Sequence, residues 1–114
     1  GGRNKANLES ARIGEKSSVA NYEKSIQTGF REVADSLAAR SGLAERIAAT
    51  EALVAAQQTR TDLATIRFDK GVDGYFEVLT ATLDLFSNRQ RLIQLRLARA
   101  VNSVDLYKAL GGGW

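Results

Sequence analysis

The 114 residues of this chain include no proline. From Arg3 to about Asp69, glycines occur only singly, at Gly14, Gly29 and Gly42. Each glycine costs a helix about 1 kcal/mol relative to alanine, whereas a proline inside a helix costs about 3 kcal/mol. The stretch therefore predicts one very long helix of roughly 100 Å, at a rise of about 1.5 Å per residue.

The composition points to helices and argues against catalysis. Alanine, leucine and arginine are frequent, while cysteine and histidine are absent. Without these two residue types, and without a glycine-rich phosphate loop after a strand, we expect no enzyme activity, metal site or cofactor. The net charge of +3 is small and the charges alternate in sign, so a nucleic acid partner is not expected.

The segment Lys70-Gly71-Val72-Asp73-Gly74 is the strongest interruption of the helical pattern. We expect Gly71 to take the left-handed conformation that ends a helix. Asp73 is a candidate to accept hydrogen bonds from the first amides of the next helix. The segment therefore predicts a tight turn between two antiparallel helices.

The predicted fold is all-α, a long antiparallel coiled-coil hairpin. Its parts are a helix over about residues 3–69, a turn over 70–74, a helix over about 75–110 and a tail over 111–114. An alternative is a three-helix arrangement, in which the first helix breaks near Ser41-Gly42.

Apolar residues follow helical spacing along both predicted helices. In the first helix one stripe consists of Val19, Tyr22, Ile26, Phe30, Val33 and Leu37. In the second helix a row at alternating spacings of four and three, typical of a coiled-coil seam, consists of Leu79, Leu83, Phe86, Gln90, Ile93, Leu97, Ala100, Val104 and Tyr107. A second row beside it consists of Val78, Leu85, Leu92 and Leu95. We therefore expect the second helix to contact neighbours on two sides.

Four short segments in order carry a family resemblance. They are Tyr22-Glu23-Lys24-Ser25-Ile26-Gln27-Thr28, Phe30-Arg31-Glu32-Val33-Ala34-Asp35, Gly71-Val72 with Tyr75 and Val78-Leu79, and Leu106-Tyr107-Lys108-Ala109-Leu110-Gly111-Gly112-Gly113-Trp114. Together they resemble the TolC-like outer-membrane factor family, in the branch that serves multidrug pumps of the resistance-nodulation-division type. The resemblance runs through the whole chain.

The resemblance implies a homotrimer that combines an outer-membrane β-barrel with a long periplasmic barrel of helices. This chain would be a helical piece of a longer protein, cut at Gly1-Gly2, in the cell outer membrane of a Gram-negative bacterium, with the segment itself in the periplasm. The channel would be a passive conduit for drugs or other small toxic solutes, served by a periplasmic adaptor and an inner-membrane pump. Lipidation of the longer protein is left open.

By the same resemblance, the turn is the channel's periplasmic tip. Candidates for adaptor contact or tip shape are Arg67, Phe68, Gly71, Val72, Gly74, Tyr75, Val78 and Leu79. Candidates for the entrance constriction are Glu77, Thr80 and Asp84. The chain departs from many relatives at Phe68, where they have tyrosine, and at Thr80, where they have aspartate.

Several of these residues have a plainer interpretation. Gly71, Val72 and Gly74 suit any helical hairpin turn. Glu77 and Asp84 form either a solvated face or a ring of carboxylates that gathers cations. The aromatic residues, expected to pack between helices rather than form a ligand cage, are Tyr22, Tyr75, Phe76, Phe86 and Tyr107.

Arg89, Arg96 and Arg99 lie on one face of the second helix, a pattern that could contact phosphates of a nucleic acid. We expect them instead to be balanced by Glu45, Glu51 and Asp62 on the antiparallel helix. Trp114 is either a free end or an anchor near the membrane.

An alternative for the whole chain is a freestanding coiled-coil scaffold that mediates oligomerisation. In either case the first helix outruns the second and leaves Arg3 to roughly Val33 without a partner in the chain. We therefore expect the isolated segment to self-associate or to refold.

Overall fold

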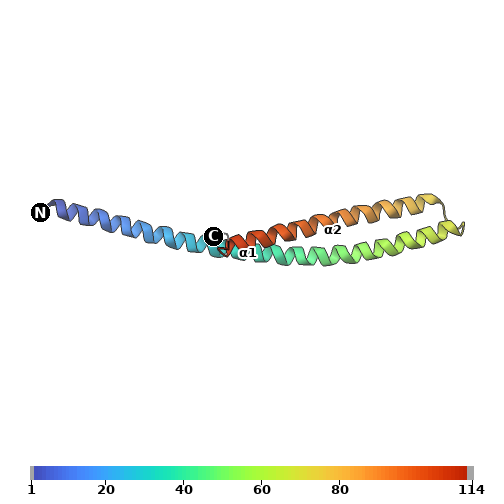
Figure 1. Cartoon of the computed structure of the whole chain (residues 1–114), viewed down its shortest axis with the longest axis horizontal. Coiled ribbons are helices and arrows are strands. Elements are labelled where there is room, and N and C mark those ends of the chain that lie inside the picture. Colours follow the sequence, from blue (N-terminus) through green and yellow to red (C-terminus); the bar gives the residue numbers. More distant parts are fainter. Residues whose placement is uncertain (1, 113–114) are drawn as a thin grey trace.

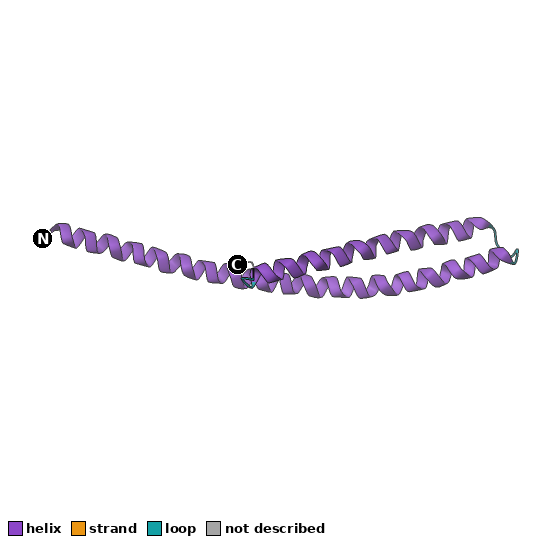
Figure 2. Cartoon of the chain, in the orientation of Figure 1, coloured by secondary structure: helices purple, strands orange, loops and turns teal. Residues whose placement is uncertain are grey.

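The computed structural model describes residues 2–112 as two α-helices joined by a short turn (Figure 1). Helix α1 spans Gly2–Asp69 and helix α2 spans Tyr75–Ala109. The helices run antiparallel, and residues 2–112 contain only helices and turns (Figure 2). The length of α1 accounts for the longest dimension of the molecule, 104 Å. The predicted all-α hairpin is confirmed, whereas the expectations for Gly1 and Trp114 lie outside the described residues.

Helix α1 continues without interruption through Ser41 and Gly42, so the three-helix alternative is wrong. No atom lies within 4 Å of the position that a Gly42 side chain would occupy, so nothing packs against Gly42 to bend the helix. Arg40 and Leu43, on either side of this point, are half-buried against α2. The second helix thus runs alongside the weakest part of the first and supports it.

The end of α1 is a Schellman turn centred on Gly71, which has a φ of 73°. The Val72 amide donates to the Arg67 carbonyl at 2.8 Å, and the Gly71 amide donates to the Phe68 carbonyl at 2.9 Å. These are the two bonds that define the motif, and the left-handed conformation predicted for Gly71 is confirmed.

Asp73 does not cap α2 as predicted. The N-cap residue is Gly74, which makes no side-chain hydrogen bond to the helix. The Asp73 carboxylate instead accepts a hydrogen bond from Arg67, which draws it back toward α1.

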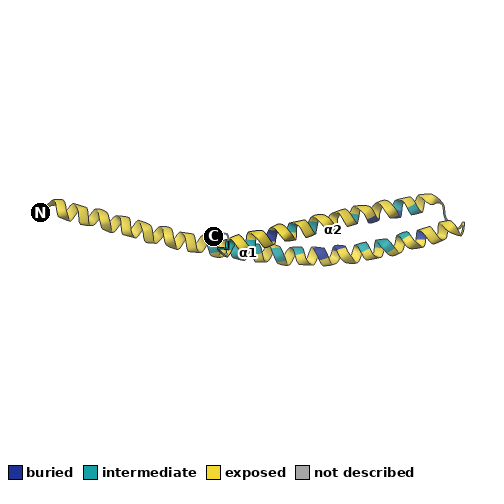
Figure 3. Cartoon of the chain, in the orientation of Figure 1, coloured by how far each residue is buried: buried dark blue, intermediate teal, exposed yellow. Residues whose placement is uncertain are grey.

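The interface between α1 and α2 is a narrow row of small, polar and branched apolar residues. The buried residues are Ile47, Thr50 and Ala64 on α1, and Ala81, Leu85, Leu92 and Asn102 on α2. Half-buried residues extend the row at spacings of three and four, for example Val33, Ser36, Arg40, Leu43, Val54, Gln57 and Thr61 on α1. Figure 3 shows these residues along the contact line between the two helices.

The row of α2 with strictly alternating spacing is not the one that packs on α1, which corrects the expected order of the two rows. Leu83, Phe86 and Leu97 of that row are 58%, 62% and 64% exposed. The second row, which includes Leu85 and Leu92, meets α1 instead. Cross-helix ion pairs, from Arg60 to Asp84 and from Arg96 to Glu51, flank this second row.

Residues 2–28 of α1 extend beyond the end of α2 and are exposed throughout (Figure 3). At 1.5 Å per residue this overhang is about 40 Å long. It carries Val19, Tyr22 and Ile26, which are 52%, 69% and 41% exposed. Within residues 2–112, neither helix is long and apolar enough to cross a membrane.

Replacing Gly71 with alanine should lower the free energy of unfolding by about 1 kcal/mol, because its φ is positive and an alanine there would be strained. The matched control is Gly74→Ser. Gly74 has a φ of −76°, which any residue adopts, and a serine oxygen could cap α2. Neither site has an atom within 4 Å of an added Cβ, so neither substitution introduces a steric clash. Thermal unfolding followed by circular dichroism measures both, and equal losses would contradict this account of the turn.

Candidate functional site

The candidate site is the tip of the hairpin, where apolar side chains are exposed on both helices and on the turn. Val72 and Phe76 are 61% and 73% exposed, and Leu79 is 44% exposed. Phe68 and Tyr75 meet edge to face, with ring centroids 5.3 Å apart and an angle of 67° between the planes. The tip therefore presents an apolar end surface around a preformed aromatic pair.

Arg67 holds the turn through both its backbone and its side chain. Its carbonyl accepts hydrogen bonds from the amides of Val72 and Asp73, at 2.8 and 3.4 Å. Its Nε donates to Asp73 Oδ2 at 2.5 Å. The Asp73 side chain is only 33% exposed, so this pair is partly shielded from water. One arginine thus ties α1 to the residue just before the cap of α2.

Of the neighbouring candidates Val78 and Leu79, one faces inward and one outward. Val78 is half-buried in the row that meets α1, whereas Leu79 lies in the exposed row. The structure therefore gives Val78 a role in joining the helices at the tip and leaves Leu79 free for contact with another surface.

The three entrance candidates lie on one side of α2, at spacings of three and four. Glu77 is exposed and lines a shallow groove between the helices together with Arg60, Arg67 and Asp73. Thr80 is half-buried. Asp84 is bound by Arg60 Nη1 at 2.7 Å, so its charge is largely balanced within the chain. Of the two expected carboxylates, Glu77 is the one that keeps a free negative charge in the groove.

The arginines on the other side of α2 are partly balanced as predicted. Arg96 Nη2 lies 3.3 Å from Glu51 Oε1. Arg89 does not reach Asp62 directly. Its Nη2 donates to Gln58 Oε1, and Gln58 Nε2 in turn donates to Asp62 Oδ1 at 3.0 Å. Gln58 therefore links the cation to the carboxylate, a relay that pairing by charge alone would miss.

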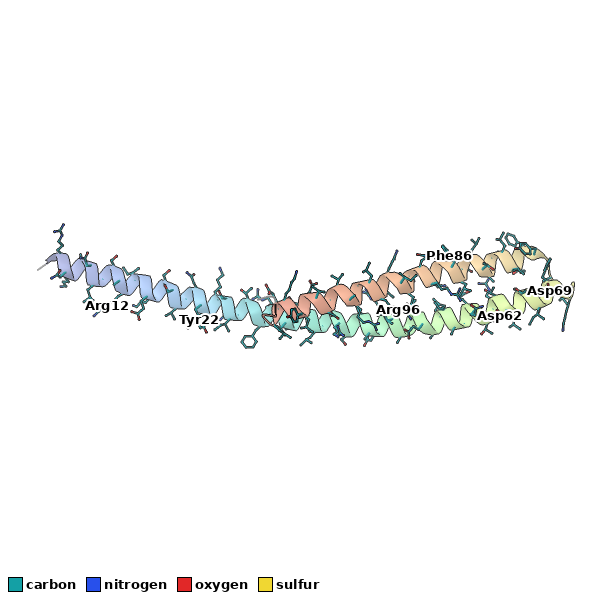
Figure 4. The ribbon with its side chains drawn as sticks, viewed as in Figure 1. Arg12, Tyr22, Asp62, Asp69, Phe86 and Arg96 are labelled. Atoms are coloured by element: carbon teal, nitrogen blue, oxygen red, sulfur yellow. The ribbon has the colours of Figure 1, made fainter. Side chains whose placement is uncertain are left out.

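Of the aromatic residues that were expected to pack between helices, Tyr75 meets Phe68 of α1, whereas three others do not pack between α1 and α2. Tyr22, Phe86 and Tyr107 are 69%, 62% and 62% exposed, at distant points along the molecule. Figure 4 shows Phe86 on the side of α2 that points away from α1, and Tyr22 on the overhang. Their separation also rules out a single aromatic cage formed by one chain.

The sequence-based analysis missed the pairs Arg60 to Asp84 and Arg67 to Asp73. Both pairs follow from the position of the turn. In an antiparallel hairpin, residues that lie equally far before and after the apex are neighbours across the two helices. Within residues 2–112, no group of three or more acidic, cysteine or histidine residues is arranged to hold a metal ion.

Comparison with known proteins agrees with this geometry. The family model for outer membrane efflux proteins matches residues 1–112, and the chain belongs to that family. It is a family of efflux channels and not of enzymes.

Individual relatives match nearly the whole chain. The cation efflux system protein CusC of Escherichia coli O6:H1 is 47% identical over 99% of the chain and 25% of its own length. The solvent efflux pump outer membrane protein SrpC of Pseudomonas putida is 48% identical over 99% of the chain and 24% of its own length. The probable outer membrane lipoprotein SilC of Salmonella typhimurium is 40% identical, again over 99% and 24%. The chain thus spans about a quarter of the length of these relatives.

Solved structures show the same helical arrangement. A crystal structure of CusC superposes with a TM-score of 0.83 and 44% identity, over 84% of this chain and 27% of that one. A membrane protein from Pseudomonas aeruginosa superposes with a TM-score of 0.78 and 44% identity, over 100% and 26%. The extended hairpin is therefore a conformation that relatives of this chain adopt.

Replacing Asp73 with asparagine should speed hydrogen exchange at the amides of Val72 and Asp73, because Arg67 loses its ionic partner at the turn. We expect a stability loss of under about 1 kcal/mol, smaller at high salt, as for other partly exposed ion pairs. Asp84→Asn is the control, since it removes the same charge from the pair with Arg60 on the helix face. If both variants left exchange at the turn unchanged, Arg67 and Asp73 would not be what holds it.

Proposed function

We propose that this chain forms part of the periplasmic wall and the entrance tip of an outer-membrane efflux channel. The observation that carries the proposal is the pair of complementary outward faces on the hairpin. The outward row of α2 is bulky and exposed, with Leu83, Phe86, Ile93 and Leu97 among its members. A soluble hairpin on its own would leave this surface in water, at about 25 cal/mol per Å² of apolar area.

The outward side of α1 carries mostly small residues, in contrast to the bulky row of α2. An exposed row at spacings of four and three lies roughly opposite the contact with α2 and consists of Ala34, Ala38, Ser41, Glu45, Ala48, Ala52, Ala55 and Thr59. Small residues allow helices to approach closely, so a bulky row on one hairpin can pack into a small row on the next. Repeated side by side, such contacts produce a closed wall rather than a two-helix scaffold.

The assembly that fits this wall is a homotrimer in the outer membrane, with this segment in the periplasm. The exposed end surface formed by Phe68, Val72, Tyr75, Phe76 and Leu79 supports a docking role for the tip, with the periplasmic adaptor of an inner-membrane pump as the partner. Glu77, Thr80 and Asp84, on one side of α2 just behind the tip, are the candidates for the entrance constriction. Transport through the wall would be passive.

The cargo is proposed to be drugs or other small toxic solutes. Relatives named for cation efflux and for solvent efflux are 47% and 48% identical to this chain over nearly its whole length. Because relatives named for such different solutes are equally similar to it, this segment would serve as a general wall. Selection of the solute would then depend on other parts of the pump.

Val72→Arg in the complete protein should abolish efflux while leaving the assembled channel in the outer membrane. Val72 is exposed in the apolar end surface, and its φ is negative, so the substitution adds a charge without backbone strain. Ser17→Arg, at an exposed polar site on the overhang, is the control. Solute accumulation in cells and the amount of assembled channel are measured together. Normal efflux by Val72→Arg would show that the tip surface is not a docking site.

A further inference from the structure

Hydrophobic burial alone does not explain which face of α2 meets α1. The buried row contains Ala81 and Asn102 beside Leu85 and Leu92, whereas the exposed row contains Leu83, Phe86 and Leu97. Burial of apolar area is non-directional and grows with the area removed from water, so it would favour the bulkier row. Another interaction must help to select the smaller and more polar face.

A polar cluster centred on the buried Asn102 joins the helices near the end opposite the turn, with Arg40 half-buried and Ser103 exposed. Asn102 is 6% exposed. Its Nδ2 donates to the Ser36 carbonyl at 2.9 Å, and its Oδ1 accepts from Arg40 Nη1 at 3.4 Å. The same Arg40 nitrogen donates to Ser103 Oγ at 2.8 Å. Both ends of the amide are thus bonded to α1, and these directional bonds form in only one orientation of α2.

A second asparagine in the same row behaves differently. Asn88 lies two heptads before Asn102 and is half-buried on the same side of α2. Its Nδ2 donates to the Asp84 carbonyl of its own helix at 3.0 Å. This bond would survive any rotation of α2. A polar residue in the buried row therefore does not by itself bond to α1. Of these two asparagines, only Asn102 makes hydrogen bonds across the helices.

The other ionic contacts between the helices are too exposed to select the face of α2 that meets α1. In the Arg60 to Asp84 and Arg96 to Glu51 pairs, all four side chains are 44% to 51% exposed. Exposed pairs of this kind contribute little and are screened by salt. The Schellman turn fixes only one end of the hairpin. What remains to orient the far end of α2 is the cluster around Asn102.

We propose that Asn102, together with Arg40, is a positioning device that selects the face of α2 that packs on α1. A single buried asparagine is a known means of specifying one packing of a coiled coil at some cost in stability. By fixing the rotation of α2, Asn102 also keeps the bulky row outward and Glu77 and Asp84 on one side. The inference concerns the hairpin itself and does not depend on the proposed transport function.

The test uses a cross-link that forms only in the observed orientation, in the complete protein. Glu51 and Arg96 are replaced by cysteine, because their side chains meet across the two helices, and a short bifunctional maleimide joins them. The linked peptide is measured by mass spectrometry. Asn102→Leu should lower its yield about fivefold or more, since the loss of hydrogen bonds that include one to a charged group changes populations by about that factor. Asn88→Leu, the matched control, should change it by less than about twofold.

Equal yields in Asn102→Leu and Asn88→Leu, or equal losses in both, would overturn the proposal and leave Asn102 as a merely tolerated polar residue. Circular dichroism shows whether each variant is folded. Should Asn102→Leu fail to fold, Arg40→Met carries the test, because it removes the donor from α1 and leaves α2 unchanged. A reduced cross-link in Arg40→Met supports the proposal, and an unchanged cross-link contradicts it.

Discussion

The second helix carries apolar side chains on two nearly opposite faces, and a single antiparallel partner can cover only one of them. In this chain α1 covers the smaller face, which includes Ala81, Leu85 and Leu92. The larger face, with Phe86 and Leu97, stays exposed. The hairpin is therefore a flat, two-helix ribbon with a bulky edge and an alanine-rich edge. Its elongated shape, its lack of a deep core and its need for lateral neighbours all follow from this one imbalance.

The contacts between α1 and α2 fix the relative orientation of the helices more than they stabilise the hairpin. Its interface is narrow, and no large side chain is completely buried among the described residues. Polar contacts fasten it at both ends, through Arg67 and Asp73 at the turn and through Arg40 and Asn102 at the far end. Such an interface contributes little free energy by itself but defines how the two helices are oriented. In the proposed wall, contacts made by the outward faces would add most of the buried apolar area.

The sequence predicted the long first helix, the turn at Gly71, the antiparallel partner and the unpaired overhang, because proline, glycine and hydrophobic spacing act locally. It did not predict which apolar row of α2 would face α1. Regular spacing identified the bulkier row as the seam, but the orientation depends on bonds from Asn102 and Arg40, which are 62 residues apart. The same limit applies at the tip, where Asp73 suited a helix cap by type but was drawn to Arg67.

The two apolar faces of α2 also limit how much of its surface can remain in contact with water. In a wall of helices both faces are occupied by neighbours, and only the two polar arcs between them remain. One arc carries Glu77, Thr80 and Asp84, with negative charge near the tip. The other carries Arg89, Arg96 and Ser103, and its arginines are held by Gln58 and Glu51 of α1. In the proposed channel, one of these arcs faces the conduit and the other the periplasm. Because the orientation of α2 decides the side on which each arc lies, the packing of the hairpin would also set the charge that a solute meets in the proposed channel.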